Sequence, residues 1–165
     1  MKVLVIDPKI AGISGDMLIA ALVDLTGSAG LLEPVADAIR GLSCCDHFSF
    51  EVHDVDAGGI SAKKINVEVG EKNHRTHEDM KDSIVEITKK TGLSDTAENL
   101  AFQIIDDLLS ADAKLHRPMV HHHEMLSVDT LFDVAGSLAL LDHHGFLEGE
   151  IFGTPPVLGS GFTRI

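Results

Sequence analysis

The spacing of hydrophobic residues changes several times along the 165 residues, and each spacing predicts a different element. Residues 2–7 form a short, β-branched apolar run that ends at Pro8, which predicts a buried strand. A glycine-rich loop over residues 11–16 follows this strand. Helical spacing then predicts one helix over residues 16–25 and a second over residues 32–40, the latter lying between two glycines.

Strict alternation of apolar and polar residues begins at Phe48 and continues to about Val69. Gly58 and Gly59 interrupt it, and a glycine pair between two alternating runs is typical of a hairpin turn. The polar stretch over residues 73–79 predicts a loop. We therefore expect two antiparallel strands in the middle of the chain.

Helical spacing returns over residues 78–91, 95–113 and 129–143, and a tail rich in glycine and proline covers residues 151–165. We predict a single domain over residues 1–165 of the α/β class, with α+β as the alternative. It would begin with a strand, a glycine loop and a helix, and would carry a central antiparallel hairpin with several helices packed on the sheet.

The net charge of the chain limits the kinds of ligand that it can bind. The chain has 26 acidic and 13 basic residues, for a net charge of −13, so it is unsuited to a phosphate backbone and better suited to cations. No apolar run is long enough to cross a bilayer, and the first residues lack the pattern of a signal peptide, so we expect a cytoplasmic protein that binds neither membrane nor nucleic acid. The adjacent Cys44 and Cys45 are expected to be reduced thiols.

Three consecutive histidines and a glutamate, residues 121–124, are the most informative polar cluster. In an extended segment His121 and His123 share a face while His122 points away. Together with Glu124 they offer imidazole and carboxylate ligands, which suit nickel, zinc, cobalt, copper or iron. The alternatives are a surface histidine run that binds metal adventitiously, and histidines hydrogen-bonded within a core.

Asp129 and Asp133 are one helical turn apart and so lie on one face of the helix predicted there. Two carboxylates at this spacing repel each other unless a cation, an arginine or hydrogen bonds compensate. Asp129 could serve only as a helix cap. Asp133 stands in the apolar sequence LFDVA, where a merely solvated acid is not expected, and is the stronger candidate for a functional role.

The loop GISGDM, residues 12–17, follows a strand and opens a helix. Backbone N–H groups at such a junction can bind an anion, so Gly12, Ser14, Gly15 and Asp16 are candidates for a phosphate site. The alternative is a tight turn between strand and helix. A further alternative is that Asp7 and Asp16 hold a magnesium ion or a substrate hydroxyl.

Taken together, these motifs resemble the LarC family, the nickel-insertion proteins for the nickel pincer nucleotide cofactor of lactate racemase. The resemblance rests on four stretches, which occur in the family's order: Asp7 with residues 11–17, residues 120–124, residues 129–136, and residues 155–162. His122 departs from the family's aromatic position, and Leu126-Ser127 replaces a usual Gly-Ala pair. The family is also longer and carries a C-terminal domain associated with CTP, so this chain resembles the N-terminal domain alone.

The resemblance implies a role in inserting nickel into pyridinium-3,5-bisthiocarboxylic acid mononucleotide, with formation of carbon–nickel and sulfur–nickel bonds. On this basis His121, His123 and Glu124 would receive nickel, and Asp133 and Glu124 are the candidate catalytic carboxylates. The loop from Gly12 to Asp16 would seat the substrate's phosphate. CTP, with manganese or magnesium, would require the missing domain.

These observations leave three hypotheses for the function. The first is a nickel-binding domain of a CTP-dependent nickel chelatase, which belongs to the lyase class, although the chain is short for catalysis. The second is a non-catalytic metal-binding or assembly module that needs a companion C-terminal chain. The third is a phosphate- or nucleotide-binding α/β protein. Assembly with further copies of itself is left open by the sequence.

Overall fold

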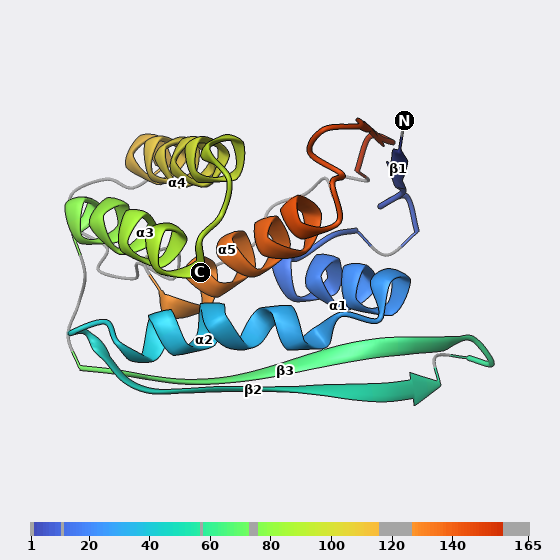
Figure 1. Ribbon diagram of the computed structural model, residues 1–165, viewed down its shortest axis with the longest axis horizontal. Coiled ribbons are helices and arrows are strands. Elements are labelled where there is room, and N and C mark those ends of the chain that lie inside the picture. Colours follow the sequence, from blue (N-terminus) through green and yellow to red (C-terminus); the bar gives the residue numbers. More distant parts are fainter. Residues whose placement is uncertain (1, 11, 57, 73–75, 116–126, 157–165) are drawn as a thin grey trace.

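The computed structural model describes residues 2–10, 12–56, 58–72, 76–115 and 127–156. These residues form the predicted mixed α/β fold, with a parallel pair of strands, an antiparallel hairpin and five α-helices (Figure 1). In chain order the elements are β1 (Val3–Ile6), α1 (Gly15–Thr26), the 3-10 turn η1 (Ala29–Leu32), α2 (Glu33–Arg40), β2 (Cys45–Asp56), β3 (Ser61–Glu71), α3 (His77–Thr91), α4 (Asp95–Leu115), α5 (Val128–His143) and β4 (Glu150–Gly153).

The hairpin of β2 and β3 forms one outer layer, and α1 and α2 pack on its inner face (Figure 1). Alternation gives this face Phe48, Phe50 and Val52 on β2, which pair with Val69, Val67 and Ile65 on β3. Gly58 and Gly59 both have positive φ, 66° and 86°, which explains the glycine pair at the turn. The predicted hairpin is confirmed.

Helix α5 runs through the middle of the molecule and contacts α1, α2, α3, α4 and β3 (Figure 1). Eleven of its 16 residues are buried, so it is apolar on almost every side rather than along one stripe. Phe132 is fully buried, and its ring lies 5.0 Å from that of Phe48 and 5.4 Å from that of Phe50. This aromatic contact fixes α5 against the hairpin.

The parallel pair of β1 and β4 lies at the opposite end of the molecule from α3 and α4 (Figure 1). Leu4 pairs with Ile151, and the Glu150 N–H donates a hydrogen bond to the Lys2 carbonyl at 3.0 Å. The sequence did not predict β4, because four residues with a glycine show too little alternation to be recognised. Three of its four residues fall in the tail over residues 151–165, for which only a richness in glycine and proline was noted.

Two smaller differences concern helix ends. Helix α3 begins at His77 rather than at Glu78, because Thr76 and Asp79 form a capping box. The loop predicted over residues 73–79 is therefore shorter at its end. No helix in the described part of the chain has the length and apolar character that a membrane crossing needs.

Candidate functional site

Two motifs more than 100 residues apart in the sequence meet where α1 begins beside α5. Gly15, the first residue of α1, lies directly against the side chain of Asp133. A Cβ atom added to Gly15 would stand 2.1 Å from the Asp133 Cγ atom, far inside any real contact. Glycine is therefore required at position 15, because the Asp133 side chain approaches this backbone so closely.

Asp133 is a half-buried acid on the largely buried helix α5. Its Oδ1 atom is buried and accepts no hydrogen bond from the described residues. Burial raises the pKa of the Asp133 carboxyl to about 7, with further contributions from the negative charges of Asp129 and Asp16. Near neutral pH this carboxyl can therefore either hold or release a proton.

Asp129 and Glu71 add two more negative charges near Asp133, and Asp129 is exposed at the surface. Partial burial of the Asp129 carboxyl raises its pKa, and the charges of Asp16 and Glu71 raise it further. Glu71, the last residue of β3, accepts a hydrogen bond from the Val128 N–H at 2.5 Å and so caps the start of α5. We call Asp16, Glu71, Asp129 and Asp133 the carboxylate cluster.

An open groove of about 850 Å³ adjoins the carboxylate cluster. It is lined by Asp16, Ser127 and Asp129 together with residues 64–69 of β3. Because these six residues are consecutive, the groove follows the edge of β3 that faces away from β2. The cluster is thus accessible to a ligand several atoms long, with Lys64 as the cation on its wall.

Two polar groups of the GISGD loop already have partners. The Gly12 N–H donates to the Pro8 carbonyl at 3.0 Å, and the Ser14 hydroxyl donates to the Asp16 carboxylate. Three carboxylates of the cluster surround the start of α1, so the local field favours a cation or a proton over a phosphate. That Gly12, Ser14, Gly15 and Asp16 seat a phosphate stays a prediction.

Asp7 and Asp16, the alternative pair for magnesium, line different hollows. Asp7 accepts hydrogen bonds from the Thr154 hydroxyl and the Lys9 N–H, and so joins the end of β1 to the residue after β4. Its role in the structure is to tie these two segments together.

The predicted ligands His121, His123 and Glu124 lie outside the described residues. Within the described part of the chain, no three histidine, cysteine, aspartate or glutamate side chains are arranged to hold a metal ion, so the carboxylate cluster alone is not a formed metal site. In the sequence, Glu124 stands three residues before Ser127, which lines the groove. The histidine segment is therefore close in sequence to a residue that lines the groove.

Glu71 was missed by the sequence analysis. The spacing of the sequence did not single it out, and its partner Val128 is 57 residues away. No local spacing links the two, so only the packing of β3 beside α5 reveals the contact.

Comparison with known proteins gives one family. A family model described as "Nickel insertion protein" matches residues 4–165. A relative from Geotalea uraniireducens is 35% identical over 158 residues, which are 93% of this chain and 38% of that protein. No solved structure matches the chain.

Two further relatives carry a more specific name, pyridinium-3,5-bisthiocarboxylic acid mononucleotide nickel insertion protein. The one from a Nocardioides species is 31% identical over 155 residues, covering 92% of this chain and 37% of the relative. The one from Acetivibrio thermocellus is 30% identical over 171 residues, which cover 98% of this chain and 40% of the relative. The chain therefore spans about two fifths of the length of the curated relatives it matches.

Proposed function

The chain belongs to the nickel insertion protein family, and from that premise we propose that it is a nickel-binding domain that takes part in inserting nickel into pyridinium-3,5-bisthiocarboxylic acid mononucleotide. In this reaction nickel is cargo, transferred from protein ligands to the sulfur and carbon atoms of the substrate. The substrate class comes from the names of the longer relatives.

One observation supports the proposal: the GISGD loop and the DTLFDVAG motif, which are separate in the sequence, are in contact in the fold. Gly15 of the first motif packs against Asp133 of the second, and Asp16 adds its charge to that of Asp129. The groove beside them gives a ligand access to this junction. A cluster of negative charge next to a groove attracts a divalent cation.

His121, His123 and Glu124 are the proposed nickel ligands. Imidazole and carboxylate bind nickel without the softness of thiolate, so the ion can pass to the substrate's sulfurs. They stand a few residues before Ser127, which lines the groove, and there the carboxylate cluster would hold the cation by charge. Glu124 is the ligand nearest in sequence to this cluster.

Asp133 is the proposed proton acceptor. Metal binding requires deprotonated ligands, and replacing a carbon-bound proton with nickel likewise releases a proton. A carboxyl whose pKa is raised to about 7 can accept that proton at neutral pH, whereas an ordinary aspartate would be too weak a base. Ionised Asp133 would also add negative charge beside the cation.

A second candidate is a nickel-binding module that needs another polypeptide for turnover. The observation that favours it is length, because the chain covers only 37–40% of the relatives described above. Both candidates predict a nickel site on this chain. They differ in whether the chain alone makes the nickelated product.

The test is calorimetric titration of the tag-free chain with nickel. We expect one nickel ion per chain, and we expect the double variant His121→Ala/His123→Ala to weaken binding by on the order of 100-fold or more. The matched control is His47→Ala/His53→Ala, which removes two exposed histidines from β2. It should leave the affinity within about twofold, because these side chains lie outside the proposed site.

Loss of binding in both double variants, or in neither, would contradict the assignment of His121 and His123. The wild-type chain is then incubated with the mononucleotide, CTP, manganese and nickel. Formation of nickelated product by the chain alone supports the enzymatic candidate. Nickel binding without product supports the module.

A further inference from the structure

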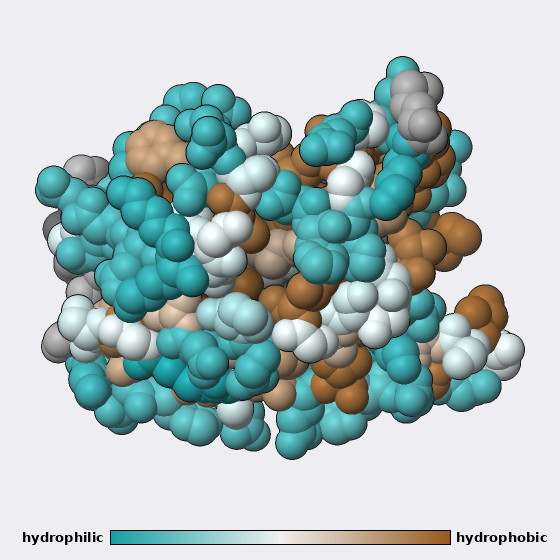
Figure 2. Space-filling model, in the orientation of Figure 1, coloured by the Kyte–Doolittle hydropathy of each residue, from teal (hydrophilic) through white to brown (hydrophobic). Residues whose placement is uncertain are grey.

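Exposed apolar side chains gather at the end of the molecule that carries β1 and β4. Of the eleven large hydrophobic side chains that are exposed among the described residues, eight come from β1, β4, α1 and the loop after β1. Figure 2 shows hydrophobic side chains reaching the surface on the right of the molecule, where Figure 1 places β1. The eight are Val3, Val5, Ile10, Ile13, Met17, Leu25, Ile151 and Phe152.

The sheet at this end is unusual for its type. Strands β1 and β4 are parallel, and parallel sheets are almost always covered on both faces. Here all four residues of β4 are exposed, and of the four in β1 only Leu4 is buried. In the described part of the chain, β1 pairs with β4 alone, so its other edge carries unpaired backbone groups.

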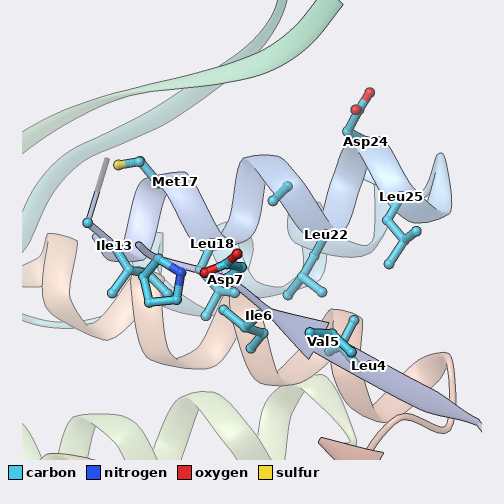
Figure 3. A pocket seen from close by; sticks show the side chains of 13 residues that line it. Leu4, Val5, Ile6, Asp7, Ile13, Met17, Leu18, Leu22, Asp24 and Leu25 are labelled. Carbon is cyan, nitrogen blue, oxygen red and sulfur yellow. The ribbon is translucent and has the colours of Figure 1, made fainter. Parts of the chain in front are cut away.

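A groove of about 470 Å³ runs along that edge (Figure 3). One wall is formed by Leu4, Val5 and Ile6, three consecutive residues of β1, so the groove follows the strand's backbone rather than one face. The other wall is the apolar side of α1, including Leu18 and Leu22. No residue of β4 lines it. The groove thus combines a strand edge with an apolar surface.

We propose that this groove is a docking site for a β-strand with apolar side chains, supplied by the polypeptide that the longer relatives have beyond the part matching this chain. The strand would add to the open edge of β1 through backbone hydrogen bonds, and its alternate side chains would pack against α1. Asp7 and Asp24 at the groove favour lysine or arginine at the ends of the docking segment.

The length of the relatives supports this occupant over others. The Acetivibrio thermocellus relative shares 171 aligned residues with this chain, and these make up only 40% of its length. The remaining 60% is additional polypeptide, long enough to supply a strand that covers an open edge of the shared part. An open parallel strand edge beside exposed apolar side chains is the part of this fold that most needs covering.

Hydrogen exchange of backbone amides, followed by mass spectrometry, tests the proposal. It is measured on this chain and on the full-length Acetivibrio thermocellus relative, each normalised to its own β2–β3 hairpin. We expect the β1 segment to exchange at least about tenfold faster in this chain than in the relative. A lysine at the relative's position aligned with Val5 should raise β1 exchange by a similar factor, since charge at a strand edge prevents pairing.

The matched control is a lysine at the position aligned with Ile60, which is 70% exposed compared with 64% for Val5. It should leave β1 exchange unchanged. If the hairpin itself exchanges faster in the Val5 variant, the fold is disturbed, and a lysine aligned with Leu25 replaces it as the test on α1.

Three results would overturn the proposal. The first is equal β1 exchange in the two proteins. The second is β1 protection in this chain that rises with protein concentration, which would assign the groove to a second copy. The third is β1 protection in this chain that disappears when residues 157–165 are deleted, which would assign the groove to the chain's own tail. None of these readouts depends on nickel, so this test is independent of the proposed function.

Discussion

At Gly15 the backbone of α1 lies so close to the Asp133 carboxyl that a methyl group has no room. We expect Gly15→Ala to lower the free energy of unfolding by about 1–3 kcal/mol, because the added Cβ must displace either the helix start or the buried carboxyl. Urea denaturation measures this. In the matched variant Gly30→Ala the new methyl group meets no atom within 4 Å, and a change within about 0.5 kcal/mol is expected. Equal stability of the two variants would refute the close contact.

The raised pKa of Asp133 makes stability depend on pH in a defined direction. Its ordinary value is 3.8 and its value in the folded protein is about 7. Between these values the unfolded chain has lost the proton that the folded chain retains, so this group's contribution to stability falls as pH rises from about 4 to 7. Well above pH 7 the carboxyl is ionised in both the folded and the unfolded chain, so the destabilisation from Asp133 no longer changes with pH.

Asp133→Asn should remove this dependence, because the amide is neutral at every pH and close in shape. We expect the variant to be more stable than the wild-type protein at pH 8 and to lose that advantage at pH 4. Urea denaturation of both proteins across this range provides the measurement. If their stability difference stays constant with pH, Asp133 has an ordinary pKa and the proposed proton acceptor is wrong.

The acids of the carboxylate cluster differ in how far the local sequence predicts their role. Asp133 could be singled out because an acid within an apolar helical run is conspicuous. Asp129 was expected to share a helix face with Asp133, and Asp16 was a candidate in the glycine loop, but the approach of Asp16 to these two acids was not visible. That approach depends on the packing of α1 beside α5, which is a long-range property.

Among the elements, α5 depends most on its aromatic contact with the hairpin. The chain has seven phenylalanines and no tryptophan or tyrosine, so the fully buried Phe132 is a large share of its aromatic packing. We expect Phe132→Ala to cost about 3–5 kcal/mol of unfolding free energy. Phe102→Ala, on the exposed side of α4 where the ring is 40% accessible, should cost less than about 1 kcal/mol. Thermal and urea denaturation measure the stability of the two variants. Similar losses of unfolding free energy in both would show that α5 is not the central element of the fold.

The elements with strong periodicity and clear ends were predicted well. Helix α2 ends at Arg40 as expected, and α5 ends at His143. The helix of η1 and α2 begins earlier than expected, as a 3-10 turn from Ala29. Strand β4 was missed because its stability comes from pairing with β1 and not from its own sequence.

On the scale of the whole molecule, two grooves of different chemistry border the same helix, α1. The carboxylate cluster and its groove lie at the start of α5, beside the end of β3. The apolar groove lies along β1 and α1. Helix α1 borders both, with Asp16 on the first and Leu22 on the second. A polypeptide docked on β1 would therefore contact the helix whose first turn forms part of the carboxylate cluster.

The central claim is that the histidine segment and the carboxylate cluster form one nickel site. Nickel is paramagnetic and broadens the NMR signals of nearby nuclei, so a ¹H–¹⁵N titration of the chain with substoichiometric nickel locates the ion directly. The account predicts that amides of Gly15, Asp16 and the first turn of α5 broaden first, while those of Gly59 at the hairpin turn stay sharp. Broadening centred instead on His143 and His144, or on His47 and His53, would place nickel elsewhere and contradict the account.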